Sequence, residues 1–109
     1  MRQTFKPLRE VWMNVSIERI DTYKGRTVKA LLNSGAMEMF MSRGLAKKGE
    51  YKLIKLKQPI RVRNVDDTGN SADAITHEVE VNMFYKRHVE RVWMDICELG
   101  KTDVILDML

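Results

Sequence analysis

The chain has 109 residues, of which 44% are hydrophobic and 31% are charged. These proportions exclude a disordered chain, and the length predicts a single domain spanning residues 1–109. The formal net charge is only +4, and no apolar run approaches a membrane span, so we expect neither a nucleic-acid partner nor a membrane partner. The single cysteine, Cys97, excludes an internal disulfide and a cysteine-based zinc site. It fits a reducing, intracellular and cytoplasmic setting.

The first half of the chain predicts a β-hairpin followed by a short helix. Apolar and polar residues alternate from Val11 to Ile20, as in a half-buried strand. A turn follows at residues 21–25, and a second strand is expected over residues 26–33. The segment from Met37 to Lys48 is the one expected helix, because Gly49 stands where helices commonly stop.

The second half predicts more strands joined by turns. Residues 51–65 contain two strand-like pieces, and Pro59 indicates a break or a sheet edge between them. His88 falls in an expected tight connection. Further strands are expected over residues 75–85, 89–97 and 104–106. Many short strands with frequent turns argue for an all-β barrel or sandwich with little helix.

Most familiar catalytic and metal-binding patterns are missing from the sequence. His77 and His88 are the only histidines and lack the spacing of a metal pair, so we expect no metal and no cofactor. Ser34 lies in no Gly-x-Ser-x-Gly turn. Residues 42–50 match neither the phosphate-binding loop nor the dinucleotide pattern. The acidic pair at residues 66–67 lies in a turn-forming stretch, which explains it without catalysis.

One pattern stands out, because an apolar strand ends in the turn "NSGA" at residues 33–36 and the apolar run "DVIL" follows much later at residues 103–106. With these motifs the chain resembles the retropepsin-type aspartic proteases, particularly the protease domains of gypsy-like long-terminal-repeat retrotransposons. Their hallmarks are an apolar strand that ends in Asp-Ser/Thr-Gly-Ala and a hydrophobic Ile-Leu-Gly stretch near the C-terminus. The resemblance extends from about Leu8 to Met108, and residues 59–81 resemble the strand, flap hairpin and return strand of the family.

The resemblance implies an all-β, retropepsin-like acid protease barrel with a flap hairpin and one short helix. It also implies a homodimer, in which two identical subunits each give one carboxylate to a pair that shares a proton and activates water against a polypeptide substrate. Family chains continue past the equivalent of Leu109, so we expect part of the dimer interface to be missing. The catalytic turn maps by resemblance onto Asn33, Ser34 and Gly35. The substrate contacts map onto Ala36, Asp67, Thr68, Gly69 and Ile105.

The sequence departs from the family pattern at the catalytic position itself. Asn33 stands where the family has aspartate, and an amide cannot exchange a proton near neutral pH, so we expect no proteolysis by this chain. Asp107 stands where the family has glycine after Ile-Leu. Each change needs one G-to-A transition in its codon, which favours a decayed transposon copy over a deliberate replacement at Asn33. A coding sequence that differs from sibling copies only at codon 33 would contradict this decay hypothesis.

Two other classes of function stay open. The first is a non-catalytic module that keeps the retropepsin-like fold for dimerisation or peptide binding, and peptide capture without proteolysis would favour it. The second is a small β-barrel that binds nucleic acid through the basic strip between Lys47 and Arg63. Tyr51 is the only aromatic residue in that strip, which leaves little for bases to stack on.

Overall fold

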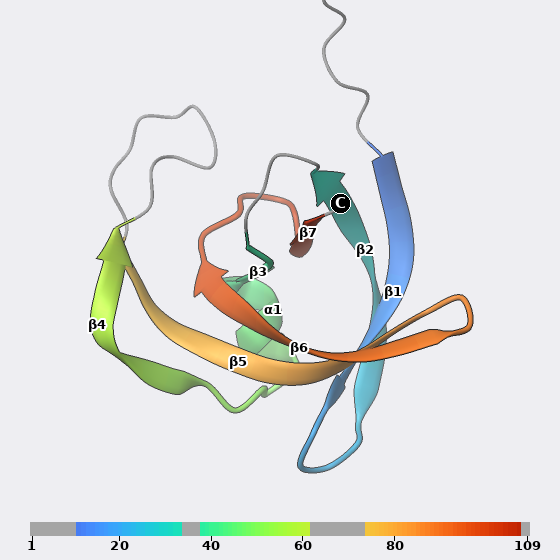
Figure 1. Ribbon diagram of the computed structural model, residues 1–109, viewed down its shortest axis with the longest axis horizontal. Coiled ribbons are helices and arrows are strands. Elements are labelled where there is room, and N and C mark those ends of the chain that lie inside the picture. Colours follow the sequence, from blue (N-terminus) through green and yellow to red (C-terminus); the bar gives the residue numbers. More distant parts are fainter. Residues whose placement is uncertain (1–10, 34–37, 62–73, 108–109) are drawn as a thin grey trace, which may run out of the picture.

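The computed structural model describes residues 11–33, 38–61 and 74–107, which form seven strands and one helix (Figure 1). The elements are β1 (Val11–Arg19), β2 (Gly25–Asn33), β3 (Phe40–Ser42), α1 (Arg43–Lys48), β4 (Ile54–Arg61), β5 (Ala74–Tyr85), β6 (His88–Cys97) and β7 (Val104–Asp107).

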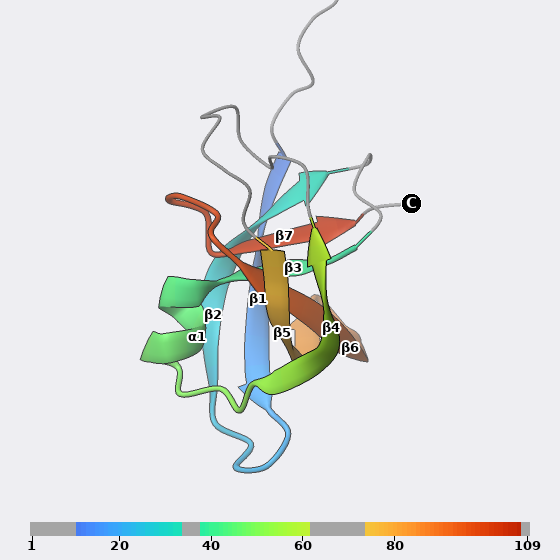
Figure 2. The same ribbon diagram turned by 90° about the vertical axis from the view of Figure 1, so that its left-hand side faces the viewer.

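All seven strands belong to one sheet that curls back on itself. The strand order is β1-β2-β7-β3-β6-β5-β4, and β1 also pairs with β5, so six strands close a ring to which β4 is attached. The long strand β5 makes this closure possible. On one edge it pairs with β4 near its start and with β1 over Val81–Phe84, and on the other edge it pairs with β6. The strong curvature of the sheet is visible in Figures 1 and 2. The expected all-β barrel with one short helix is confirmed.

The hairpin predicted at the start of the chain is confirmed by the antiparallel pairing of β1 and β2. The half-buried strand expected from the alternation is confirmed in β1. Val15 and Ile17 are buried in the barrel, while Trp12 on the other face is 38% exposed. Burial of alternate β-branched residues on a curved sheet is what holds such a strand in register.

The barrel encloses two groups of buried apolar side chains. The main core fills the space between β1, β2, β5, β6, β7 and α1. A smaller second cluster consists of Ile75, Cys97, Leu99 and Ile105. Leu31, Phe40 and Leu56 are partly buried against it. Cys97 therefore packs as a core residue, as its apolar sequence context indicates.

A helix was predicted from Met37 to Lys48, but α1 begins only at Arg43, so the predicted start is wrong. Phe40–Ser42 form strand β3, which pairs with both β6 and β7, so the backbone groups of this segment are used by two ladders before a helix can begin. The Ser42 hydroxyl accepts a hydrogen bond from the Leu45 N–H at 3.0 Å and caps the helix. The predicted end is confirmed, because the Gly49 N–H donates to the Leu45 carbonyl at 2.9 Å.

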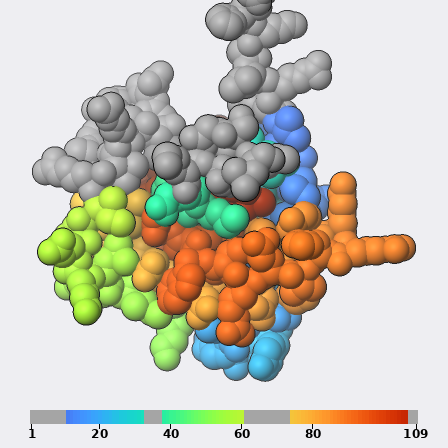
Figure 3. Space-filling model, viewed as in Figure 1, coloured from blue at the N-terminus to red at the C-terminus, as the bar shows by residue number. Residues whose placement is uncertain are grey.

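Within residues 51–61 the structure has one strand, β4, whose register against β5 shifts between Lys55 and Ile60. Residues 62–65, the rest of the two expected strand pieces, lie outside the described residues. Pro59 lies in this irregular stretch, and β4 comes last in the strand order, which confirms the expected sheet edge. In Figure 3 the side chains of β4 lie at the lower left of the molecule.

The connection after β5 differs from the prediction by one residue, and the connection before β5 lies outside the described residues. The link between β5 and β6 is the turn Lys86–Arg87, and Lys86 has a positive φ of 53°. His88 is already the first residue of β6, so its placement in the connection is wrong by one position. The antiparallel β4–β5 pair is joined through residues 62–73. The expected flap tip at residues 66–74 falls almost wholly outside the described residues and stays a prediction.

Candidate functional site

The two sequence motifs meet at the paired ends of β2 and β7. These strands are parallel, with Ala30 opposite Val104 and, at the last position of each strand, Asn33 opposite Asp107. Segments far apart in the sequence are therefore backbone neighbours, as the resemblance requires (Figure 1). The strand expected over residues 104–106 is confirmed, because Val104, Ile105 and Leu106 belong to β7 and are all buried.

Strand β7 is held on both edges, which fixes the position of its end. Besides β2, it pairs with β3 in the antiparallel sense, with Phe40 opposite Ile105. The Ser42 N–H also donates to the Asp103 carbonyl at 2.8 Å, just before β7 begins. Apolar contacts to the main core on one face and to the second cluster on the other add to these backbone bonds. Such support on every side is what a site needs to hold groups in a fixed geometry.

The structure describes only part of the predicted site. Asn33 and Asp107 are described by their backbone pairing, while Ser34, Gly35, Ala36, Asp67, Thr68 and Gly69 lie outside the described residues. Ile105 is described, and only 6% of its surface is exposed because it packs in the second cluster. Its expected contact with substrate stays a prediction.

Sequence reasoning missed Asp95, a buried carboxyl group on β6, which is separated from β7 by β3. Asp95 lies on β6 and is 8% exposed. It is opposite Glu78 of β5 and opposite Phe40 of β3. Its backbone N–H donates to the Met39 carbonyl at 2.9 Å, in the segment that follows the Asn33 turn. Burial raises the pKa of Asp95 to about 6, with further increases from Glu38 and Glu78.

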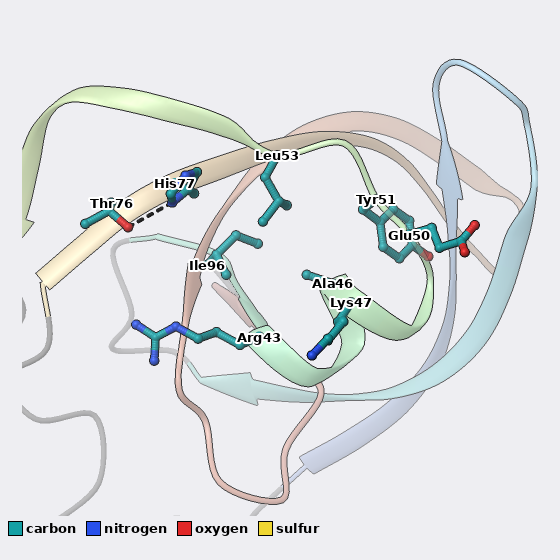
Figure 4. A pocket seen from close by; sticks show the side chains of 9 residues that line it. All are labelled: Arg43, Ala46, Lys47, Glu50, Tyr51, Leu53, Thr76, His77 and Ile96. Carbon is teal, nitrogen blue, oxygen red and sulfur yellow. Dashed lines mark hydrogen bonds between the residues drawn. The ribbon is translucent and has the colours of Figure 1, made fainter.

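A pocket of about 510 Å³ opens elsewhere, between α1 and the first half of β5 (Figure 4). Figure 4 shows Arg43 and Lys47 on the α1 side and Thr76 and His77 on the β5 side. The Tyr51 side chain lines one end, and its hydroxyl donates a hydrogen bond to the Ile17 carbonyl at 2.7 Å. None of the residues predicted for the catalytic site is among the described residues that line this pocket.

The two histidines have no metal-binding arrangement in the part of the chain that is described. His77 lies half-buried at the pocket, with Nδ1 at 2.8 Å from the Thr76 hydroxyl, and His88 is exposed. Across residues 11–33, 38–61 and 74–107, no group of three or more His, Cys, Asp or Glu side chains could hold a metal ion. No helix in these same ranges is long and apolar enough to cross a membrane.

Comparison with known proteins agrees with the geometry. No curated protein matches the chain. A family model described as the PEG10/RTL1 protease domain matches residues 29–109. The match begins inside β2 and includes both ends of the β2–β7 pair. Since it covers well over half of the chain and the barrel is of the expected type, the chain belongs to the PEG10/RTL1 protease domain family, retropepsin-like aspartic protease domains from gypsy-like retrotransposon derivatives.

Proposed function

We propose that this chain is the protease domain of a retrotransposon gag-pol polyprotein, an aspartic endopeptidase by descent that is inactive because Asn33 replaces the catalytic aspartate. The observation that carries the proposal is the parallel pairing of Asn33 with Asp107 at the ends of β2 and β7, within the residues that match the protease family. This is where the family's catalytic turn and its Ile-Leu-Gly stretch are expected to meet.

The inactivity follows from the chemistry of the paired acids. In an aspartic protease two close carboxyl groups hold one proton between them, because both cannot ionise together. The ionised member takes a proton from water, which attacks the peptide carbonyl, and the protonated member gives its proton to the substrate. A side-chain amide can neither take up nor release that proton near neutral pH. Two copies of Asn33 therefore leave the site without a general base.

The site is proposed to form between two copies of the chain. Each chain has one Asn-Ser-Gly-Ala turn, whereas the reaction needs two facing groups, so a two-fold axis between subunits supplies the second. The start of β1 supports this arrangement, because Val11 is the partner of Leu32, next to Asn33, and Val11 and Trp12 are 49% and 38% exposed. Exposed apolar side chains next to a strand end are suited to burial by a partner.

Asp107 is proposed as a second obstacle to activity. Neighbouring strands lie about 4.8 Å apart, and position 107 of β7 is the backbone partner of position 33. A nearby like charge raises the pKa of a carboxyl group and opposes ionisation of the restored pair. We therefore expect Asn33→Asp alone to recover little activity, and Asn33→Asp with Asp107→Gly to recover more.

The test is cleavage of a mixed peptide library between pH 3 and pH 8. The parent chain, Asn33→Asp, and Asn33→Asp with Asp107→Gly are compared. The matched control is Asn33→Asp with Asp103→Gly, which removes the same charge from an exposed position just before β7. Below neutral pH we expect the double revertant to be the most active, Asn33→Asp and the control to have little activity, and the parent to have none. An analogue with a hydroxyl group at the scissile carbonyl should inhibit the activity. Cleavage by the parent chain that such an analogue blocks would contradict the proposal.

A folded double revertant that dimerises and captures peptides but cleaves none of them would instead favour the non-catalytic binding module.

A further inference from the structure

The pocket between α1 and β5 interrupts the apolar interior of the barrel. Ile75, Val79 and Val81 are buried residues on the inward face of β5, and each is at most 1% exposed. By the two-residue period of a strand, His77 belongs to the same face, yet it is polar and only half-buried. Since His77 lines the pocket, its side chain borders a space that the core leaves open.

The short helix explains why the core stops at this point. The backbone of α1 approaches β3 and β6 but no part of β5 that the structure describes, so a space remains between helix and strand. Ala46 of α1 and Ile96 of β6 are buried residues that give this space an apolar wall. Tyr51 contributes its ring, because its hydroxyl is used in the bond to the Ile17 carbonyl. The volume of about 510 Å³ falls within the roughly 300–1,000 Å³ of small-molecule sites.

Cationic side chains stand around this apolar space. Arg43 and Lys47 are four positions apart on α1, and residues at this spacing share one face of a helix. Figure 4 shows both across the pocket from His77. Within the described part of the chain, Lys47 forms no ion pair. The Thr76 hydroxyl lies 2.8 Å from Nδ1 of His77 and so restrains the ring.

Glu50 is the only acid among the described residues that line the pocket, and it lies away from these cations. Figure 4 shows Glu50 beside Tyr51, with its carboxylate directed away from the α1 cations. The pKa of Arg19 is raised chiefly by the hydrogen bond to Asp21 and less strongly by the charge of Glu50, so Glu50 acts on β1. The described lining therefore combines an apolar wall with an excess of positive charge. An anionic group attached to an apolar body complements both features.

We infer that this pocket binds a small molecule that carries a carboxylate on an apolar body. The carboxylate lies between the α1 cations and the His77 ring, where charge-assisted hydrogen bonds are available. The apolar part lies against Ala46 and Ile96, and it also covers Leu53, a lining residue that is 37% exposed. The pocket is separate from the strand ends of β2 and β7, so this binding depends neither on the proposed function nor on proteolysis.

The first measurement is a calorimetric titration of the chain with octanoate at pH 7, accompanied by NMR spectra of the backbone amides. Octan-1-ol, which lacks the charge, and acetate, which lacks the apolar body, are the matched probes. We expect octanoate to bind about tenfold more tightly than either, and to shift the amide signals of Ala46, Tyr51 and Ile96. Equally tight binding of octan-1-ol would overturn the inference. So would shifts confined to Val89 and Trp93, which are exposed apolar residues outside the lining of the pocket.

The second measurement repeats the titrations on variants. Lys47→Glu places a negative charge in the pocket and should weaken octanoate binding about tenfold or more. Its matched control is Lys48→Glu, an equal change of charge at the next exposed position of α1, outside the pocket lining. The control should alter the affinity less than about twofold, because exposed charges are screened by water and salt. Equal losses in the two variants would refute the inference.

His77→Val separates recognition of the charge from support of the fold, because it completes the apolar face of β5. We expect this variant to weaken the binding of octanoate and to leave that of octan-1-ol unchanged or stronger. A residue with a purely structural role would affect both probes alike, and that result would contradict the assigned position of the carboxylate.

Discussion

The substitution Asp95→Asn should change how the stability of the protein depends on pH. The pKa of Asp95 is raised from 3.8 to about 6, chiefly by burial. Because the folded chain keeps this proton up to about pH 6 while the unfolded chain releases it near pH 3.8, the contribution to stability is full below 3.8 and is lost as the pH rises through 6. At about 1.4 kcal/mol per pH unit the loss has an upper bound of about 3 kcal/mol. Because Asp95 keeps 8% of its surface exposed, solvent screening reduces the expected loss to about 1–2 kcal/mol.

The assay is urea unfolding of the parent chain and of Asp95→Asn at several values between pH 4 and pH 8. The difference between their free energies of unfolding removes the contributions of all other titrating groups. We expect this difference to move in favour of the variant by about 1–2 kcal/mol between pH 4 and pH 7, because an amide carries no charge to desolvate. Asp103→Asn, at an exposed position, serves as the control. Its free energy of unfolding should change with pH in the same way as that of the parent. If the free energy of unfolding of Asp95→Asn also changes with pH in the same way as that of the parent, the reasoning about the buried acid is wrong.

Three other substitutions test the packing that supports the site, each by its urea midpoint. Tyr51→Phe removes the hydrogen bond to the Ile17 carbonyl and should cost about 1–3 kcal/mol, so an unchanged midpoint would show that the bond is not formed. Ser42→Ala removes the cap that binds the Leu45 N–H and should cost about 1 kcal/mol, whereas no loss would contradict the assigned helix start. Leu106→Ala leaves a cavity beside β2 and should cost about 2–5 kcal/mol, unless β7 is not part of the core.

Local patterns were enough to predict the hairpin and the buried run at the end of the chain. Alternation from Val11 to Ile20 and the turn after it specify two neighbouring strands without help from distant residues. The apolar run that became β7 is recognisable for the same reason. Its parallel pairing with β2 is not contained in any local pattern and was not predicted.

The errors share a cause, which is pairing between segments that are distant in sequence. Residues such as Phe40 and Met41 are compatible with helix, and only the ladders to β6 and β7 make them a strand. Alternation assigns Asp95 to the same face of β6 as the exposed Trp93. The alternation within β6 cannot show that Met39, just before β3, lies next to Asp95 and accepts a hydrogen bond from its backbone N–H. The buried acid therefore became visible only in the folded chain.

The most direct test of the central claim is the number of inhibitor molecules bound per chain. One active site is proposed on the axis between two copies of the protein, with position 33 of each copy contributing to it. Calorimetric titration of Asn33→Asp with Asp107→Gly, using an analogue with a hydroxyl group at the scissile carbonyl, should therefore give one analogue bound per two chains. The parent chain should bind it more weakly, because Asn33 offers no shared proton. One analogue bound per chain, or equally tight binding by the parent chain, would contradict the account.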